Sequence, residues 1–231
     1  MALNNSPGIT GFGGYVPRLR LERTAIAVAH RWMAPGLRGL AKGKRAFCSW
    51  DEDAVTMAVE AVRDALNGRQ ASDYRRLTLA STRMPFANVQ NSSLVASALT
   101  LPASAGTMDV GYSERAGVSG LLQALRGAAE PSIFVASDHP HGKPASTQEM
   151  AYGAGAAAFT LGTERVVAGL IGSASRNNVF VDHFRGEGER FDYFWEERWI
   201  RDEGYAKLVP EAIAAALKSA DFLTIIGAAS R

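Results

Sequence analysis

Short apolar segments alternate with helical patterns along most of this 231-residue chain, and this alternation is the feature that most limits its fold. Strand-like segments lie at 8–16, 76–81, 107–110, 132–137, 156–161, 166–173 and 223–226. Helical patterns lie at 21–30, after 49–52, at 92–99, after 114 and at 194–218. Strands that alternate with helices favour parallel pairing with right-handed crossovers. The sequence therefore predicts an α/β fold with a mostly parallel central sheet flanked by helices.

Two of the helical patterns have a predicted core face. Ser49 and Glu52 have the spacing of a capping box. Apolar residues then recur at helical spacing, at Val55, Ala58, Val59, Val62 and Leu66. In the helix after 114 we expect the core face at Val118, Leu121, Leu122 and Leu125. Small residues at 116, 117, 119 and 120 leave the other face thin, which permits close approach by a neighbouring element.

The longest helical pattern, 194–218, contains Gly204 and Pro210. Proline removes a helical hydrogen bond and clashes with the preceding turn, so we expect a break near 204–209. Trp195, Trp199 and Tyr205 make this helix aromatic, which fits either packing on the sheet or a docking surface.

Composition excludes several classes of protein. The chain is 47% hydrophobic with a net charge of +2, so neither nucleic acid nor an anionic membrane is an expected partner. It has neither an apolar run long enough to span a bilayer nor a signal-peptide pattern at its N-terminus. Cys48 is the single cysteine, which rules out an internal disulfide and fits the reducing cytoplasm. We expect a cytoplasmic protein in which Cys48 is a structural thiol.

Six segments together carry a resemblance to a known family. They are 8–18 (GITGFGGYVPR), 51–61 (DEDAVTMAVEA), 109–125 (DVGYSERAGVSGLLQAL), 152–158 (YGAGAAA) and the pair 180–185 and 195–205. These segments resemble the thiolase superfamily, above all its hydroxymethylglutaryl-CoA synthase and ketoacyl synthase III branch. The resemblance implies a thiolase-like fold and a single half of the usual two-half arrangement. It predicts that 1–220 form the N-terminal half and that 221–231 begin the second half.

The resemblance also indicates where the family's nucleophile would lie. In that family a Cys opens the helix, two residues before an Ala-Gly pair. The pair here is Ala116-Gly117, so the Cys position falls on Glu114, next to Ser113. Glu114 fits a general base that faces an acyl pocket, although the helix dipole makes it a weak base unless it is desolvated. Ser113 would need an adjacent base to act as a nucleophile, and none is evident in the sequence. Either residue also fits a plain helix cap.

Arginines and lysines are the predicted contacts to a ligand. Arg83 stands where the resemblance implies an acidic catalytic residue. A guanidinium does not deprotonate, but it binds carboxylates and phosphates well. Arg18, Lys44 and Arg45 resemble residues that meet coenzyme A phosphates in relatives. The alternative for all four is a solvated loop side chain.

A short loop offers a possible metal site, which we consider and reject. Asp138, His139 and His141 lie together on a Pro-Gly loop, but a metal needs further ligands. We expect a surface loop there, with neither a metal site nor a bound cofactor.

The predicted function follows from the resemblance. It implies an acyl-CoA condensing or acyltransferase protein that takes a coenzyme A thioester as substrate but lacks the Cys, so the isolated chain is expected to be inactive. The alternative is a non-catalytic scaffold or partner subunit of an acyl-CoA-processing complex. Expected partners are acyl-CoA and either a second copy of the chain, a chain that supplies the second half, or an OB-fold and zinc-ribbon subunit.

Overall fold

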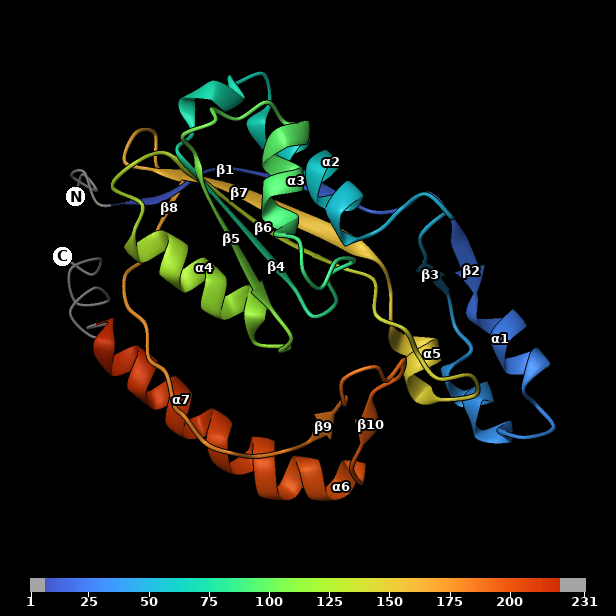
Figure 1. Ribbon diagram of the computed structural model, residues 1–231. Coiled ribbons are helices and arrows are strands. Elements are labelled where there is room, and N and C mark those ends of the chain that lie inside the picture. The colour runs from blue at the N-terminus through green and yellow to red at the C-terminus, as the bar shows by residue number, and fades with distance from the viewer. Residues whose placement is uncertain (1–6, 221–231) are drawn as a thin grey trace. The chain divides into compact units, whose positions relative to one another are not determined.

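The computed structural model describes residues 7–220 and divides the chain into two compact units, up to Gly169 and from Leu170 onward (Figure 1). The predicted strand at 223–226 and the predicted second half from 221 lie outside the described residues. Within 7–220, no helix is both long and apolar enough to cross a membrane.

The first unit is built on a six-stranded sheet with the strand order β5-β4-β6-β7-β1-β8. Its strands are β1 (Gly8–Tyr15), β4 (Arg76–Ser81), β5 (Gly106–Gly111), β6 (Ser132–Asp138), β7 (Gly155–Gly162) and β8 (Ala168–Gly169). Strand β4 pairs in parallel with β5 and β6. Strand β7 pairs antiparallel with β6 and β1, and β8 pairs antiparallel with β1.

The α/β class with a central sheet flanked by helices that the sequence predicted is correct, but the sheet is mixed instead of mostly parallel, and parallel pairing is confined to β5-β4-β6. The connection from β6 to β7 explains the difference. It contains the short helix α5 (Thr147–Ala151), which packs against η1 (Pro35–Leu40) instead of covering the sheet. Without a helical crossover over the sheet, β7 returns antiparallel to β6.

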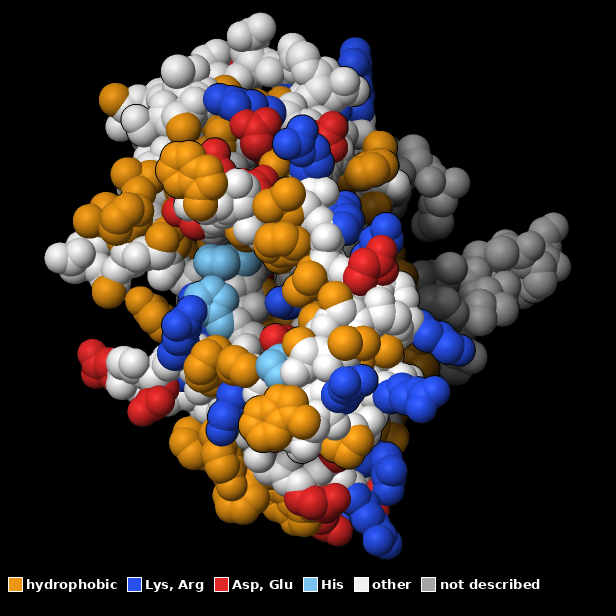
Figure 2. Space-filling model, turned by 90° about the vertical axis from the view of Figure 1, so that its right-hand side faces the viewer, with side chains coloured by type: hydrophobic (Ala, Val, Ile, Leu, Met, Phe, Trp, Pro, Cys, Tyr) orange, Lys and Arg blue, Asp and Glu red, His pale blue; other side chains and the backbone are white. Residues whose placement is uncertain are grey.

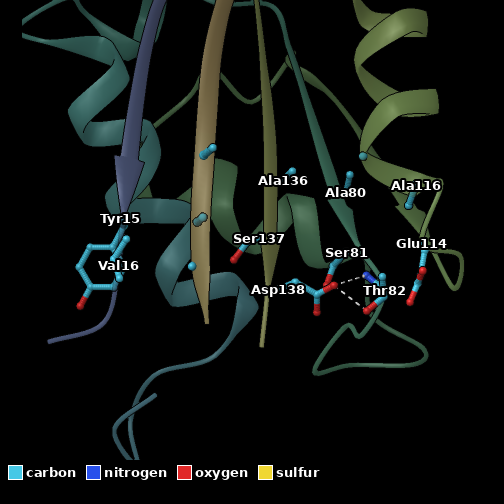
Figure 3. A pocket seen from close by; sticks show the side chains of 14 residues that line it. Tyr15, Val16, Ala80, Ser81, Thr82, Glu114, Ala116, Ala136, Ser137 and Asp138 are labelled. Carbon is cyan, nitrogen blue, oxygen red and sulfur yellow. Dashed lines mark hydrogen bonds between the residues drawn. The ribbon is translucent and has the colours of Figure 1, made fainter. Parts of the chain in front are cut away.

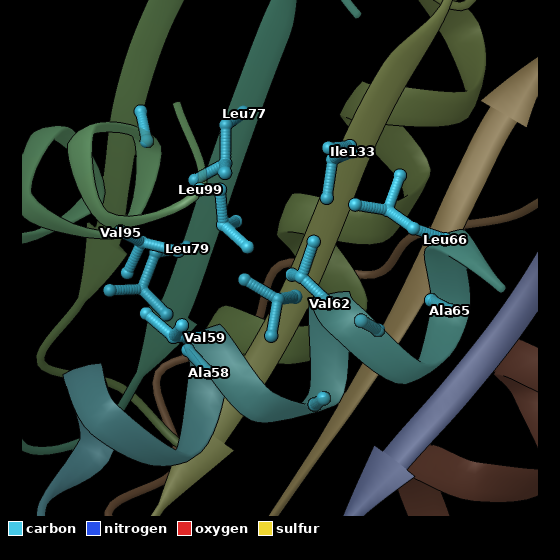
Figure 4. Close-up of a cluster of buried hydrophobic side chains, with 14 of the residues drawn as sticks. Ala58, Val59, Val62, Ala65, Leu66, Leu77, Leu79, Val95, Leu99 and Ile133 are labelled. Carbon is cyan, nitrogen blue, oxygen red and sulfur yellow. The ribbon is translucent and has the colours of Figure 1, made fainter. Parts of the chain in front are cut away.

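Helices α2 (Ala54–Leu66) and α3 (Asn91–Ala98) cover one face of this sheet. Figure 4 shows the apolar face of α2 lying on Leu77, Leu79 and Ile133 of the central strands. All five residues of the predicted core face, Val55, Ala58, Val59, Val62 and Leu66, are buried. The helical spacing therefore identified the packing surface of α2 correctly.

Helix α2 begins later than the capping pattern at Ser49 predicted. Its N-cap is Asp53, whose Oδ1 accepts the N–H groups of Val55 and Thr56 at 2.9 and 2.8 Å. Thr56 Oγ1 completes the box by accepting the N–H of Asp53 at 2.7 Å. Glu52 still accepts the N–H of Ser49 at 2.6 Å, but this bond closes a turn before the helix.

Helix α4 (Ala116–Arg126) covers the opposite face, and the predicted core face is confirmed at Leu121 and Leu125 but not at Val118. Ala116, Gly120 and Leu125 are buried against the sheet, whereas Val118 is 64% exposed. A Cβ on Gly120 would lie 2.9 Å from the ring of Phe134 on β6. The small residues therefore let α4 approach the sheet closely. Val118, which was predicted to face the core, faces solvent instead.

A small lobe extends from this unit. It consists of β2 (Arg20–Glu22), β3 (Lys44–Ala46), α1 (Arg23–Ala29), η1 and α5, around a core of Ile26, Leu37 and Met150. Arg23 ties it together by donating to the carbonyl oxygens of Met150, Lys42 and Lys44. Trp32 and Trp50 are strongly exposed, and Figure 2 shows hydrophobic side chains between Lys and Arg side chains on one face of the molecule.

The second unit contains a two-stranded ribbon and a long helix. The ribbon pairs β9 (His183–Phe184) with β10 (Tyr193–Phe194). The helix runs through α6 (Glu197–Trp199), the π-helical segment η3 (Ile200–Tyr205) and α7 (Ala206–Ser219). The predicted break at 204–209 is therefore a change of helix type, and Pro210 lies inside α7. Gly204 allows the Phe180 ring, which stacks on Trp199, to approach η3.

Candidate functional site

A groove of about 440 Å³ lies at the ends of the central strands in the first unit (Figure 3). The carboxyl ends of β4 and β6, the end of β1 and the beginning of β7 line it, together with the beginning of α4. Most lining side chains are small, among them Ala80, Ala116, Gly117, Ala136 and Ala156. Open α/β sheets bind their ligands at the carboxyl ends of parallel strands, so this is the favoured place for a ligand.

The polar part of the groove is organised by Asp138, the last residue of β6. Asp138 Oδ2 accepts the backbone N–H of Thr82 at 3.1 Å and the Thr82 hydroxyl at 2.6 Å. Figure 3 shows both bonds at the mouth of the groove. Next to Thr82, Ser81 Oγ bonds the backbone N–H and carbonyl of Arg83, each at 3.1 Å. The chain after β4 is therefore held in a fixed turn.

Glu114 lines the groove, and the catalytic role that the resemblance implies for it stays a prediction. It lies in the turn between β5 and α4. Ser113 Oγ accepts the N–H of Arg115 at 3.2 Å, and the Ser113 carbonyl accepts the N–H of Ala116 at 2.9 Å. Ser113 thus stabilises the turn locally, whereas Glu114 faces the groove. The chain enters this turn through Tyr112, whose φ of +64° lies in the left-handed region.

The four predicted ligand-binding cations lie in different places. Arg83 follows β4 beside the groove. Burial of His139 lowers its pKa, and the positive charge of Arg83 lowers that pKa further. Arg18 lines a separate cavity of about 540 Å³ with three acidic residues, Asp51, Glu52 and Glu60.

Lys44 and Arg45 lie on β3, in the small lobe. Lys44 pairs with Glu22 at 2.9 Å, and Arg45 donates to the Tyr152 carbonyl at 3.2 Å. Arg18, Lys44 and Arg45 are absent from the groove lining among the described residues. Their predicted contact with coenzyme A stays a prediction.

Cys48 lies in the first unit near α2, with its Sγ 3.8 Å from Met57 Sδ. Burial, followed by the charges of Glu52 and Asp53, raises the pKa of Cys48 to about 11. A thiol is nucleophilic as the thiolate, so Cys48 stays protonated and weakly reactive at neutral pH.

The loop after β6 contains His139 and His141, whose rings meet edge to face at 5.3 Å. Within residues 7–220, His, Cys, Asp and Glu side chains do not gather in threes in a way that could hold a metal ion. The argument against a metal site at this loop still rests on its missing ligands.

Sequence reasoning did not identify Thr82 and Asp138 as groove residues. Asp138 does follow the buried strand Ser132–Ser137, and Thr82 follows Arg76–Ser81. Polar residues directly after buried parallel strands meet at one edge of a sheet, and this signal would have identified both.

Comparison with known proteins gives a consistent picture. The chain is 28% identical over 191 residues to the hydroxymethylglutaryl-CoA synthase of Methanocaldococcus jannaschii, covering 80% of this chain and 55% of the relative. It is 31% identical over 168 residues to that of Caldivirga maquilingensis, covering 70% and 48%. The chain therefore spans about half the length of the curated relatives it matches. No model of a known protein family matches it.

Solved structures share the fold. A hydroxymethylglutaryl-CoA synthase complexed with CoA superimposes with a TM-score of 0.74 at 16% identity, covering 92% of this chain and 56% of the other. The H285N variant of Xanthomonas campestris OleA gives a TM-score of 0.78 at 18% identity, covering 94% and 74%. A 3-oxoacyl-(acyl-carrier-protein) synthase III gives 0.70 at 18% identity, covering 92% and 74%.

Proposed function

Because this chain belongs to the thiolase superfamily, in its branch similar to hydroxymethylglutaryl-CoA synthase and ketoacyl synthase III, we propose that it binds an acyl thioester of coenzyme A. We place the acyl group in the groove at the ends of β4 and β6. The hydroxymethylglutaryl-CoA synthase structure that superimposes with a TM-score of 0.74 was itself solved with CoA.

One observation carries this proposal. The groove lies where α4 begins, and the residue at the family's nucleophile position, Glu114, lines it. Half of its 14 lining residues are alanine or glycine, which leave room for an acyl chain and offer it apolar contact. The thioester therefore fits with its acyl part between Ala80, Ala116 and Ala136.

We further propose that this chain forms no acyl-enzyme. The resemblance implies that Glu114 stands where the family has its thiol, and Cys48 holds its proton too tightly to attack a thioester at neutral pH. Condensation would then depend on a partner, either a chain that supplies a second half or a small OB-fold and zinc-ribbon subunit.

The second candidate function is a non-catalytic scaffold or partner subunit. Strand β5 is the specific observation behind it, since β5 pairs with β4 alone among the described strands and leaves a sheet edge. Met108 on β5 and Val118 on α4 are both exposed. An open edge beside apolar side chains favours association, so a homo-oligomer is proposed. Light scattering at micromolar concentration tests it, and a monodisperse monomer would contradict it.

Binding is tested by calorimetry with acetyl-CoA and the variant Ala136→Leu. The larger side chain fills the groove, and we expect acetyl-CoA to bind about tenfold more weakly, a loss of about 1.4 kcal/mol. Ala29→Leu, at an exposed position of α1, is the matched control and should bind as the wild type does. Equal affinity for all three proteins would remove the groove from the proposal.

Intact-mass spectrometry after incubation with acetyl-CoA tests the absence of an acyl-enzyme. The expected mass is that of the unmodified chain. A stable acetyl adduct mapped to Ser113, Glu114 or Cys48 would show that the chain carries its own nucleophile.

A further inference from the structure

The positive charge of this chain is concentrated in one short stretch. Residues 17–46, which contain β2, α1, η1 and β3 of the small lobe, carry eight arginines and lysines against one acidic residue, Glu22. Eight positive charges and one negative charge give this stretch a net charge of +7, whereas the whole chain has +2, so the other residues together carry −5. The charge of the whole chain, which argued against an anionic partner, does not reveal this difference.

Three of these cations are exposed and are not neutralised within the lobe. Arg31, Arg38 and Lys42 lie on the surface, and within residues 7–220 their side chains form no ion pair. The acidic side chains of the lobe, Glu22 and Glu149, each already pair with a basic side chain of the lobe, at 2.9 and 3.2 Å. The positive charge of the lobe therefore remains available to an anionic partner.

Apolar side chains lie among these cations. Val28, near the end of α1, is 64% exposed, and Trp32 and Met33 in the turn that follows are 79% and 52% exposed. The N–H groups of Met33 and Ala34 close this turn by donating to the His30 carbonyl at 3.0 and 2.8 Å. Ala34 packs against the lobe core, so the turn holds Trp32 and Met33 on the outside.

The lobe does not use these apolar side chains for its own packing. Its core consists of Ile26, Ala27, Leu37 and Met150. The lobe lies at the right of Figure 1, and Figure 2 views the molecule from that side, with hydrophobic side chains beside Lys and Arg side chains. Tryptophan next to arginine and lysine is typical of surfaces that lie in the headgroup region of a bilayer.

We propose that this surface docks on an anionic phospholipid bilayer. Val28, Trp32 and Met33 enter the headgroup region, and the three cations contact the lipid phosphates. Charge complementarity favours an anionic lipid surface, and the amphipathic indole of tryptophan favours the boundary between water and acyl chains. The lobe tip, as we call this surface, consists of Val28, Arg31, Trp32, Met33, Arg38 and Lys42.

The distribution of charge also sets the orientation of docking. Salt screens the field of the lipid surface over a Debye length of about 8 Å at physiological ionic strength. The bilayer therefore attracts the charges of the lobe tip, and the net negative remainder of the chain is repelled. The lobe tip is built within the first unit alone, and the proposal goes beyond acyl-CoA binding and does not rest on it.

Sedimentation with lipid vesicles tests the proposal on the full chain. We expect binding to vesicles of phosphatidylcholine mixed with phosphatidylglycerol, little binding to phosphatidylcholine alone, and release as the salt concentration rises. Trp32→Ala should weaken binding to the mixed vesicles at least about tenfold, because it removes the largest apolar side chain of the lobe tip. Arg31→Glu should weaken binding by a similar factor, because it reverses a charge at the lipid surface.

Two variants are matched controls. Trp50 is 96% exposed, but the acidic run 51–53 follows it, so Trp50→Ala should bind as the wild type does. Lys218→Glu makes the same charge change as Arg31→Glu at an exposed position of α7, and it should also bind as the wild type does. Thermal melts check that each variant folds, and the exposed positions of all four side chains predict melting temperatures near that of the wild type.

Tryptophan fluorescence locates the contact. Mixed vesicles should shift the emission of the wild type and of Trp50→Phe to shorter wavelength, and this shift should disappear in Trp32→Phe. Absence of binding to mixed vesicles at low salt, equal weakening by Trp32→Ala and Trp50→Ala, or binding without the emission shift would each overturn the proposal. Displacement of the protein from vesicles by a single-stranded oligonucleotide would assign the lobe tip to nucleic acid and would overturn it as well.

Discussion

Asp138 at the end of β6 holds Thr82 at the end of β4 through two hydrogen bonds, one to the backbone N–H and one to the hydroxyl. This contact joins two neighbouring parallel strands at the point where they leave the sheet. It determines the course of the chain after β4 and therefore the shape of the groove mouth.

Asp138→Ala should destabilise the first unit and weaken acetyl-CoA binding. Removing a charged acceptor from two donors costs about 1–3 kcal/mol. Thr82→Val keeps the hydrogen bond from the backbone N–H and should lose less than half of the stability that Asp138→Ala loses. Urea unfolding followed by circular dichroism measures both losses, and equal stability of Asp138→Ala and the wild type would contradict the assigned contact.

Gly13→Ala should be severely destabilising. A Cβ at this position would lie 2.1 Å from the backbone nitrogen of Ala65, where α2 crosses β1. Backbone cannot move aside as a flexible side chain can, and overpacking costs about 1–3 kcal/mol or more. Gly14→Ala is the matched control, because its Cβ would meet the Ala156 carbonyl at an ordinary 3.5 Å. Equal melting temperatures for Gly13→Ala and Gly14→Ala would contradict the close crossing of β1 and α2.

Asp109 on β5 makes stability depend on pH. Its carboxylate accepts the N–H groups of Asn91 and Ser92, each at 2.7 Å, at the beginning of α3. Burial opposes the charge, but hydrogen bonds from Ser92 and Asn91 hold the pKa of Asp109 below its usual range. Because the pKa of Asp109 is lower in the folded state, its carboxylate stabilises the fold at a pH above its unfolded pKa of about 3.9. This stabilisation is lost as the pH falls through the pKa of the folded state.

Asp109→Ala should therefore cost about 1 kcal/mol at neutral pH, as loss of a helix cap does. The difference from the wild type should shrink as the pH falls below about 4. Urea unfolding across this pH range measures it. Asp73→Ala, at an exposed position of η2 (Ala71–Asp73), serves as the control. A difference that does not change with pH would exclude the charged cap.

Tyr112→Gly should stabilise the turn before α4. Tyr112 has a φ of +64° and is 75% exposed, so it bears backbone strain and buries little area. The left-handed region costs a residue with a Cβ about 1–2 kcal/mol, partly offset by the greater chain entropy of glycine. Chemical unfolding should show a gain for Tyr112→Gly and a loss for Tyr112→Val. A loss of stability for Tyr112→Gly together with a gain for Tyr112→Val would mean that the backbone of residue 112 is not in the left-handed region.

Much of the fold could be predicted because its signals are local. Strands β4 and β6 are apolar runs, and the face of α2 follows helical spacing. Strands β2 and β9 are only three and two residues long, and they exist through pairing that no local pattern reveals. The start of α2 was misplaced because Ser49–Glu52 and Asp53–Thr56 both have capping-box spacing.

The candidate site divides in the same way. Glu114 was singled out through the resemblance around Ala116-Gly117, and it lines the groove, while its role there stays a prediction. The contact between Thr82 and Asp138 joins residues far apart in sequence, so its distance could not be predicted.

The protonated state of Cys48 has a practical consequence. Cys48 is the only cysteine, and its raised pKa of about 11 makes it slow to react with alkylating reagents at neutral pH. The native chain is thus a low-background host for labels that react with thiols. A cysteine introduced by Glu114→Cys would take up a fluorophore or spin label ahead of Cys48, and that label would report directly on whatever enters the groove.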